Sequence, residues 1–501
     1  MIRSVLFGGI MDSLSIKELS MDLKEMIQEQ LSIEMTENGD VAYITSGSSC
    51  LDYYALIGGM RHNLSDATKL MLRAYYEDPI TALKLLLYTR DIHHGLGERR
   101  LFRMLFHMMS RINPKVVKSL IPYVKDYGRY DDLLTLMDTP LEKDVSKYFK
   151  HQLEEDIKHK KAGKSISLLS KWMPSINTSN HEARYYARKL AHDMHVDYQT
   201  YRKNLVYLRE TIIIENHLRL KQKLDDYTKI SEQALFKHMK TLLDNDYDAF
   251  LDFLQNDQRK ETNNIYPYQI VQKILLHPEM MDEERIMMQS FWDAFKMTEM
   301  DEHTLVVRDG SGSMYQDDLL PISVATSLAI LFSEKTQGPF KNTFLTFSEK
   351  PELITLEKGS IYDKIMATES YGEVANTDIM KVYDLILRIA QTHHIQKEHM
   401  IKRLLIISDM EFDQCIEGMS SYEYFKIEYE KSGYTLPTIV FWNVAARHIH
   451  VPIHQSDRDH VVLVSGMNHK IVENMIKNEA LNAYDLMMAT LERYEVIDTL
   501  I

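Results

Sequence analysis

Residues 305–314 read Leu-Val-Val-Arg-Asp-Gly-Ser-Gly-Ser-Met and hold a carboxylate and two hydroxyls at fixed spacing. An apolar run leads to Asp309, and Ser311 and Ser313 follow at alternate positions. Mg²⁺ is a hard cation that takes about six oxygen ligands at roughly 2.0–2.1 Å and keeps several waters. One carboxylate and two neutral hydroxyls supply such oxygens without cancelling the charge of the ion. The pattern predicts a divalent-cation site that stays open to an acidic ligand. A Gly/Ser-rich turn after a strand is the alternative interpretation.

Two further segments carry matching oxygen ligands. Thr377 precedes an apolar helical pattern, and Asp409 ends the apolar run 404–408. In an open α/β sheet, ligands bind at the carboxyl ends of strands, in the loops that lead into helices. The sequence therefore predicts one site for Mg²⁺ or Mn²⁺, with five contributing residues: Asp309, Ser311, Ser313, Thr377 and Asp409.

Arg308 stands immediately before Asp309, where an apolar strand residue is the usual choice. Two roles are open for an arginine there. It pairs with a nearby carboxylate, or its guanidinium takes the place of the cation when no metal is bound. The second role would weaken the metal interpretation, so the partner of Arg308 tests it.

Composition and length bound the class of protein. Apolar residues make up 45% of the 501 residues and aromatic residues 10%, which excludes a disordered chain, and the length predicts two or three domains. The two cysteines, Cys50 and Cys415, indicate a reducing compartment without a disulfide framework. The N-terminus shows no clear cleavage signal, and no stretch reaches the ~18 apolar residues of a membrane span. We therefore expect a cytoplasmic protein without membrane contact.

The net charge of −14 is unevenly distributed. Residues 301–501 carry 18 Lys and Arg against 30 Asp and Glu, a balance of −12. Residues 51–250 carry 33 against 26, a balance of +7. A basic central region followed by an acidic C-terminal region suggests different partners for the two.

The pattern of apolar residues divides the chain near residue 300. Residues 1–45 suggest an N-terminal arm with a helical pattern over 16–33 and a turn at 38–40. Residues 46–299 predict short helices joined by short loops, among them 79–88, 101–112, 114–124 and 131–137, as in a helical repeat of the HEAT type. Residues 300–501 predict strands alternating with helices, and hence a mostly parallel, doubly wound α/β (Rossmann-like) domain. The expected strands are 304–307, 343–347, 352–356, 403–407, 438–442 and 460–464.

The order and spacing of the five predicted ligands resemble the metal-ion-dependent adhesion site of von Willebrand factor A domains. The resemblance implies that Ser311, Ser313 and Thr377 bind the metal directly. It implies that Asp309 and Asp409 bind largely through water. The carboxylate of a protein partner, an Asp or a Glu, would then fill the last position.

A helical repeat followed by such a domain is similar to the TROVE architecture of the Ro ribonucleoprotein autoantigen. More closely, the chain resembles the family known as domain of unknown function 2828, which implies a helical ring or arc abutting the A domain. The segments that carry this resemblance are Glu37-Asn38-Gly39, Ser46-Gly47-Ser48, Gly95-x-Gly97-Glu98-Arg99, Lys171-Trp172-x-Pro174-Ser175, Tyr201-Arg202-Lys203-x-Leu205-x-x-x-Arg209, Ser408-Asp409-Met410-x-Phe412-Asp413 and Phe441-Trp442-Asn443.

Basic residues interleaved with tyrosines run through the helical region. Charge for phosphates and π-faces for bases are what a single-stranded RNA surface needs. The alternative is a solvated helix face with tyrosines in the core, or, at residues 93–100, a glycine turn between helices. The candidate RNA contacts are Arg90, Arg99, Arg100, Lys171, Arg184, Arg188, Arg202, Lys203 and Arg209.

Signals for catalysis are weak in this sequence. No Gly-rich phosphate loop, Gly-x-Ser-x-Gly elbow or His-Glu-x-x-His motif occurs. The histidines at 448, 450, 454 and 460 lack a nearby cysteine, and such spacing is more typical of surface residues than of a zinc site. We therefore expect a non-catalytic scaffold that binds single-stranded or structured RNA through the helical domain and a metal plus an acidic ligand through the A domain. The alternative is a protein-interaction module without nucleic acid.

Overall fold

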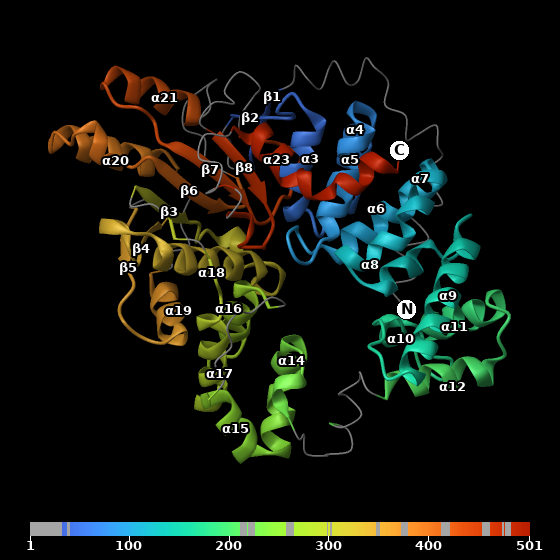
Figure 1. Ribbon diagram of the computed structural model, residues 1–501. Helices are drawn as coiled ribbons and strands as arrows, with labels where there is room; N and C mark the ends of the chain where they lie inside the picture. Colours follow the sequence, from blue (N-terminus) through green and yellow to red (C-terminus); the bar gives the residue numbers. More distant parts are fainter. Residues whose placement is uncertain are drawn as a thin grey trace.

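The computed structural model describes residues 33–37, 41–210, 218, 226–256, 265–297, 299–300, 303–346, 351–371, 379–411, 421–452, 461–472, 475 and 482–500. The turn predicted at 38–40 and residues 16–32 of the helix predicted over 16–33 fall outside these residues, and the last residue of that predicted helix, Ile33, begins strand β1. A two-stranded ribbon, β1 (Ile33–Met35) and β2 (Val41–Tyr43), pairs in antiparallel register. Figure 1 shows a helical part and a sheet with its own helices, drawn along the chain from blue to red.

One sheet of six strands organises the C-terminal part, in the order β5-β4-β3-β6-β7-β8. Neighbouring strands are parallel except for the antiparallel edge pair β4 and β5. The central strands are almost wholly buried apolar runs, as expected for parallel strands covered on both faces. All six strands predicted from the sequence are confirmed. The strands are β3 (Thr304–Arg308), β4 (Thr343–Thr346), β5 (Leu353–Thr355), β6 (Arg403–Ser408), β7 (Thr438–Asn443) and β8 (Val461–Ser465).

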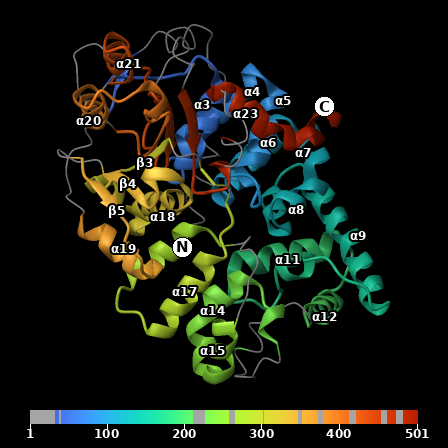
Figure 2. The ribbon, with the colours of Figure 1, turned by 60° about the vertical axis from the view of Figure 1, so that its left-hand side comes forward.

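Helices cover the sheet from both sides. Figures 1 and 2 show α18 and α19 on one side and α20 and α21 on the other. Nearly every residue of α18 is buried, because the helix packs on the sheet with one face and on α16 with the other. The helices are α18 (Leu320–Lys335), α19 (Ile361–Ser370), α20 (Ile379–Thr392), α21 (Ser421–Lys431) and α23 (Ala483–Leu491), followed by the 3₁₀ segment η10 (Glu492–Thr499).

The region before the sheet is helical, as predicted, and consecutive helices from α3 to α7 pack on one another. The predicted helix at 131–137 is a 3₁₀ helix, η3 (Tyr130–Leu136). The helices are α3 (Ser49–Leu56), α4 (Leu64–Glu77), α5 (Pro79–Arg90), α6 (Arg99–Ile112), α7 (Pro114–Leu120), α8 (Val124–Tyr127), α9 (Glu142–Lys161), α10 (Leu169–Trp172), α11 (His181–Asp193), α12 (Tyr198–Arg209), α14 (Glu232–Asn245), α15 (Tyr247–Asn256), α16 (Pro267–Leu276) and α17 (Asp282–Asp293).

Side-chain caps start several of these helices. The carboxylate of Asp78 accepts hydrogen bonds from the backbone N–H groups of Ile80 and Thr81, and Pro79 stands at the first helical position of α5. Such caps accept hydrogen bonds from backbone N–H groups that have no partner inside the helix. Proline has no N–H group, and at the first helical position this costs the helix no hydrogen bond. Because capping residues mark where these short helices begin, the positions of the helices could be predicted from the sequence.

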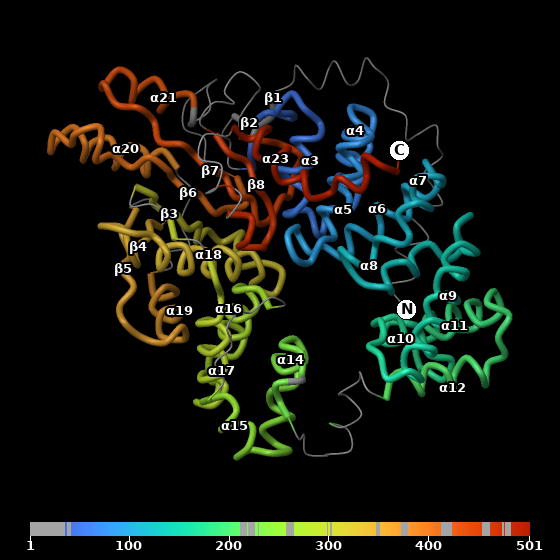
Figure 3. The backbone as a smooth tube through the Cα atoms, viewed as in Figure 1, coloured from blue at the N-terminus to red at the C-terminus, as the bar shows by residue number. Residues whose placement is uncertain are grey.

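Both ends of the helical region are anchored on the α/β part. At one end α3 packs on β8, and at the other α16 packs on α18 and α17 on α19. Figure 3 follows this path, in which the chain leaves the sheet at α3, passes α9 to α12 and returns at α16. The predicted arc that abuts the sheet fits this path, and the predicted domain boundaries at 45/46 and 299/300 stay a prediction.

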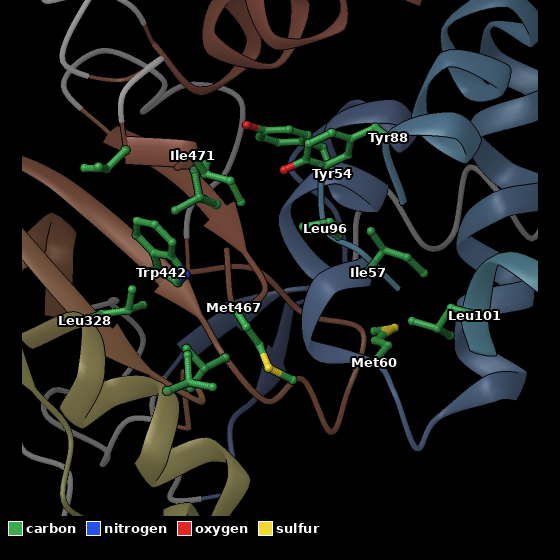
Figure 4. Close-up of a cluster of buried hydrophobic side chains, with 14 of the residues drawn as sticks. Tyr54, Ile57, Met60, Tyr88, Leu96, Leu101, Leu328, Trp442, Met467 and Ile471 are labelled. Atoms are coloured by element: carbon green, nitrogen blue, oxygen red, sulfur yellow. The ribbon is translucent and has the colours of Figure 1, made fainter. Parts of the chain in front are cut away.

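The hydrophobic core continues across the junction between α3 and the sheet. Figure 4 shows Tyr54, Ile57 and Met60 from the helical part in one cluster of buried side chains with Trp442 from β7 and Met467 from the segment after β8. The backbone at Gly58 lies close to the backbone of the turn after β8. A Cβ at residue 58 would lie 2.5 Å from the backbone nitrogen of Gly466, so only glycine fits there. The helical part and the sheet are therefore held together by core packing.

No helix in the described part of the chain is long and apolar enough to cross a membrane. The expected cytoplasmic location stays a prediction.

Candidate metal centre

The parallel pairing of β3 and β6 brings two of the predicted ligands side by side. Arg308, the last residue of β3, is in register with Ile407 in β6. Asp309 follows β3 directly and Asp409 follows β6, so both carboxylates lie at the same edge of the sheet. The backbone N–H of Asp309 also donates to the carbonyl of Ile407 (3.0 Å), which extends the ladder to the first ligand position.

Asp309 is fully buried and held from two directions. Its Oδ1 accepts from the backbone N–H of Ser311 (2.8 Å), and its Oδ2 accepts from the hydroxyl of Ser408 (2.6 Å). Burial first, and then the negative charge of Asp409, raise the pKa of Asp309 to about 6. Two adjacent buried carboxylates repel each other, and a divalent cation between or beside them would relieve that repulsion.

The two hydroxyls of the loop lie side by side. The Oγ atoms of Ser311 and Ser313 are hydrogen-bonded to each other at 3.0 Å, a separation that two adjacent ligands of an ion could keep. Two adjacent ligands of an octahedral Mg²⁺ are roughly 2.9 Å apart, which is √2 times a ligand distance of 2.0–2.1 Å. Ser311 is almost buried and Ser313 is half-buried, so the pair lies between the buried Asp309 and solvent. The donor set therefore fits the ion. In the described residues no three His, Cys, Asp or Glu side chains gather as a metal-binding group, so a cation here would have to take part of its oxygen ligands from the hydroxyls.

Thr377, the fifth predicted ligand, lies outside the described residues. The structure therefore brings four of the five predicted ligands to one edge of the sheet and does not test the fifth.

Arg308 has a carboxylate partner in α19. Its Nη2 lies 2.5 Å from Oε1 of Glu369, and its Nε donates to the hydroxyl of Thr326 (2.9 Å). The other carboxylate oxygen of Glu369 accepts from the hydroxyl of Tyr315 (2.9 Å). Of the two roles considered for Arg308, pairing with a carboxylate is confirmed, and the role in place of the cation stays a prediction.

A different arginine, not predicted from the sequence, contacts the site. Nη2 of Arg447 lies 2.8 Å from Oδ2 of Asp409, and its Nη1 lies 2.5 Å from Oε2 of Glu37 in the N-terminal ribbon. Next to Asp409, Glu411 is buried, and burial raises its pKa. Ser408 was also missed as a positioning residue, although it stands directly before Asp409 in the chain. Nothing in the spacing of Glu37 or Arg447 could have indicated this contact, because 410 residues separate them.

The histidine cluster considered for zinc is partly outside the described residues, at 454 and 460. His448 lies 3.0 Å from a carboxylate oxygen of Glu37, and His450 is buried beside Glu411, Nε2 to Oε1 3.4 Å. Burial lowers the pKa of His450 to about 4. Both rings serve the contact between the ribbon and the sheet.

Two of the basic residues proposed for RNA are used inside the helical region. Arg90 is buried, and its Nε donates to Oδ2 of Asp132 (2.7 Å), so it must be removed from the set of free cations. Arg209 donates to the carbonyl of Ser170 (2.7 Å) and to the hydroxyl of Ser175 (2.5 Å). Two of the segments that carry the family resemblance thus bind each other.

The remaining basic candidates differ in exposure. Arg184 is half-buried and lies near the carbonyl of Ser179 (3.4 Å), and Nζ of Lys171 lies 5.3 Å from the ring centre of Trp172. These two are only partly free to contact a ligand. The exposed ones are Arg99, Arg100, Arg188, Arg202 and Lys203.

Comparison with known families divides the chain in two. Residues 36–139 match the domain of unknown function DUF2828. Residues 303–496 match a second domain of unknown function, DUF7788, which covers all four described ligand positions of the metal centre. The predicted DUF2828 resemblance is thereby confirmed for the first part of the helical region. The segments at 171–175 and 201–209 lie outside both matches.

A viral relative extends the similarity over most of the chain. The chain is 29% identical over 512 residues to "Uncharacterized protein L728" of Acanthamoeba polyphaga mimivirus, and the alignment spans 92% of this chain and 88% of the relative. The aligned part therefore spans both the helical region and the sheet of this chain.

Proposed function

We propose that this protein is a non-catalytic scaffold whose sheet carries a divalent-cation site of the von Willebrand factor A type, for capture of an acidic group from a protein partner. The gathering of the Ser311 and Ser313 hydroxyls with the buried carboxylates of Asp309 and Asp409 at one edge of the sheet carries the proposal. Under this proposal the helical region is a TROVE-like repeat.

The residues of the site have separate tasks. Ser311 and Ser313 offer neutral oxygens to Mg²⁺ or Mn²⁺, and Asp309 and Asp409 supply negative charge behind them. Ser408 fixes Asp309 by donating to Oδ2 (2.6 Å) and accepting from the backbone N–H of Met410 (3.0 Å). A bound ion would supply Lewis acidity toward an external carboxylate, because the hydroxyls of Ser311 and Ser313 that would hold it directly are neutral ligands.

Calorimetric titration of the full chain with Mn²⁺ tests the site. Wild type should bind one ion, and Asp309→Ala or Ser313→Ala should abolish or strongly weaken binding. Asp317→Ala is the matched control, because Asp317 is an exposed carboxylate after the same loop, with His62 at 3.8 Å as its ion-pair contact. Absence of binding to wild type at millimolar Mn²⁺ would overturn the proposal.

A second candidate function, RNA binding, is favoured by one surface. On α11 and α12, which pack together, Arg188, Arg202 and Lys203 are exposed, and so are the rings of Tyr185 (46%) and Tyr198 (51%). We call these five residues the α11–α12 surface. Exposed cations together with exposed rings suit the phosphates and bases of a single strand.

Fluorescence anisotropy with a labelled single-stranded RNA separates this function from a protein-interaction module. Three phosphate contacts predict an affinity loss of about 20-fold between 50 and 200 mM salt. The triple variant Arg188→Glu, Arg202→Glu and Lys203→Glu should lose that binding. The control Lys358→Glu, Lys397→Glu and Lys431→Glu changes the net charge equally at exposed positions of the sheet part. No binding by wild type at low salt would leave the protein-interaction module as the better account.

A further inference from the structure

Arg447 is shared between the metal centre and the N-terminal ribbon. One guanidinium nitrogen, Nη2, contacts Oδ2 of Asp409 (2.8 Å), and the other, Nη1, contacts Oε2 of Glu37 (2.5 Å). The carbonyl of Arg447 accepts from the side-chain amide of Asn63 in the helical region (3.0 Å). The backbone of this residue is therefore fixed, and its side chain lies between two carboxylates of different elements.

Glu37 is the ribbon's main attachment near the site. Its backbone N–H donates to Oε2 of Glu411 (2.7 Å), and its side chain contacts both Arg447 and His448. Further along the ribbon, Tyr43 exchanges two backbone hydrogen bonds with Val451 (3.0 and 2.8 Å). The ribbon is thus docked on the same loop, 444–451, that carries Arg447.

The charges around Arg447 do not balance locally. The single guanidinium of Arg447 contacts the carboxylates of Asp409 and Glu37. Two more carboxylates, those of Asp309 and Glu411, lie next to Asp409. The side chain of His448 lies beside Glu37, and that of His450 lies beside Glu411. A cation bound by Asp309 and Asp409 and the guanidinium of Arg447 would draw on the same carboxylate. Because like charges repel at short range, each weakens the hold of the other on Asp409. Glu37 draws the guanidinium in the opposite direction.

We propose that Arg447 is a positioning residue that couples occupancy of the metal centre to docking of the N-terminal ribbon, a role that rests on the proposed metal site. With Glu37 in place, part of the Arg447 charge is taken up by the ribbon and Asp409 is left freer for the ion. Without Glu37, Arg447 turns its whole charge to Asp409 and competes with the ion. Docking of the ribbon and binding of the ion therefore favour each other.

Because coupling between two binding events is reciprocal, the ion also affects docking of the ribbon. If the docked ribbon raises the affinity for the ion, the ion must stabilise the docked ribbon by the same factor. A partner that pulled the ribbon away would lower the affinity for the ion and thereby release an acidic ligand held through it. The segment around Glu37 then acts on capture without touching the captured group.

A double-mutant cycle measured by Mn²⁺ calorimetry tests the coupling. Arg447→Gln should tighten binding and Glu37→Gln should weaken it, each by about fivefold or more, the low end of ordinary coupling between sites. In the Arg447→Gln background, Glu37→Gln should have little effect, because the competing cation is gone. Equal weakening by Glu37→Gln in both backgrounds would mean a direct field effect and would overturn the proposal. The controls are Arg388→Gln and Glu398→Gln, which remove the same charges at exposed positions.

Hydrogen exchange supplies a readout that does not depend on the sign of an affinity change. Backbone amides of the ribbon should exchange more slowly with Mn²⁺ than without it in wild type, and Arg447→Gln should abolish that difference. An ion that binds without slowing exchange overturns the coupling and leaves the metal site intact. Absence of Mn²⁺ binding in wild type and all three variants instead removes the metal site itself, and the coupling with it.

Discussion

The metal centre and the α11–α12 surface present their polar residues in opposite ways. At the sheet edge Asp309 is fully buried and Asp409 nearly so, and each oxygen has a named donor nearby. On α11 and α12, Arg188 and Arg202 project into solvent from helices whose other faces pack inward. Burial of charge is expensive unless the charge is paired, whereas an exposed cation needs no partner. The difference indicates a rule for this molecule: a charged residue that is buried with a partner stabilises the fold, and a charged residue that is exposed without one can contact a ligand.

The rule predicts its largest effect on the free energy of unfolding inside the helical region. Asp132 is fully buried and accepts from Nε of both Arg90 and Arg103 (2.7 Å each). Asp132→Ala leaves the buried Arg90 without its carboxylate, which should lower the free energy of unfolding by about 3–5 kcal/mol. Asp131→Ala, which removes a neighbouring carboxylate paired with partly exposed arginines, should cost roughly 1 kcal/mol in the same urea titrations. Equal losses for the two variants would break the rule.

Arg308 should behave as a structural arginine despite its place beside Asp309. Arg308→Met removes the pair with Glu369 and the bond to Thr326, and should lower the free energy of unfolding by roughly 2–3 kcal/mol. Its affinity for Mn²⁺ should stay that of wild type, because the guanidinium is already paired with Glu369. The exposed pair of Arg388 and Asp384 gives the control, and Arg388→Met should cost less than about 0.5 kcal/mol. A large change in Mn²⁺ affinity for Arg308→Met would place that arginine in the site after all.

The cost of burying an unpaired charge also predicts how a buried histidine without a partner behaves. His469 packs edge-on against Phe295, and neither ring nitrogen has a hydrogen-bond partner among the described residues. Burial lowers the pKa of His469 to about 3, below its usual 6.5. Between these values only the unfolded chain takes up a proton, so stability falls as the pH falls, by roughly 2 kcal/mol from pH 6.5 to pH 5.

His469→Phe should therefore flatten the acid limb of a stability curve measured by urea unfolding between pH 7 and pH 5. His399→Phe is the control, because His399 is exposed and its replacement should leave the limb unchanged. An unchanged limb in His469→Phe would show that this ring is already free to bind a proton.

The smallest effect is expected on the α11–α12 surface. Arg202→Glu and Lys203→Glu should change the free energy of unfolding by less than about 0.5 kcal/mol each, since neither side chain is buried. Arg209→Ala on the same helix should cost more, because its guanidinium holds carbonyls of the segment 169–175. Thermal unfolding that showed Arg202→Glu and Arg209→Ala to be equally damaging would remove the distinction between free and structural cations.

Sequence patterns predicted the sheet better than they predicted the surroundings of the site. The six strands and four of the ligands could be placed because strand ends and loop residues are neighbours in the chain. Arg447 and Glu37 could not, since their contact depends on where the ribbon docks, far away in sequence. In the helical region, Arg202 and Arg209 were both candidate RNA contacts and lie seven residues apart in one helix, yet one is exposed and the other binds backbone carbonyls. Periodicity gives the face of a helix and does not say what covers it.

The packing of α3 on β8 has a consequence for synthesis of the protein on the ribosome. Residues 49–56 emerge about 400 residues before the strand that covers them, 461–465. At roughly 5–20 residues per second, the buried face of α3 waits some 20–80 seconds for its partner. During that time the side chains of Tyr53, Tyr54 and Leu56 are without part of their final cover. The nascent chain should therefore depend on chaperones that bind apolar segments until the last strand is added.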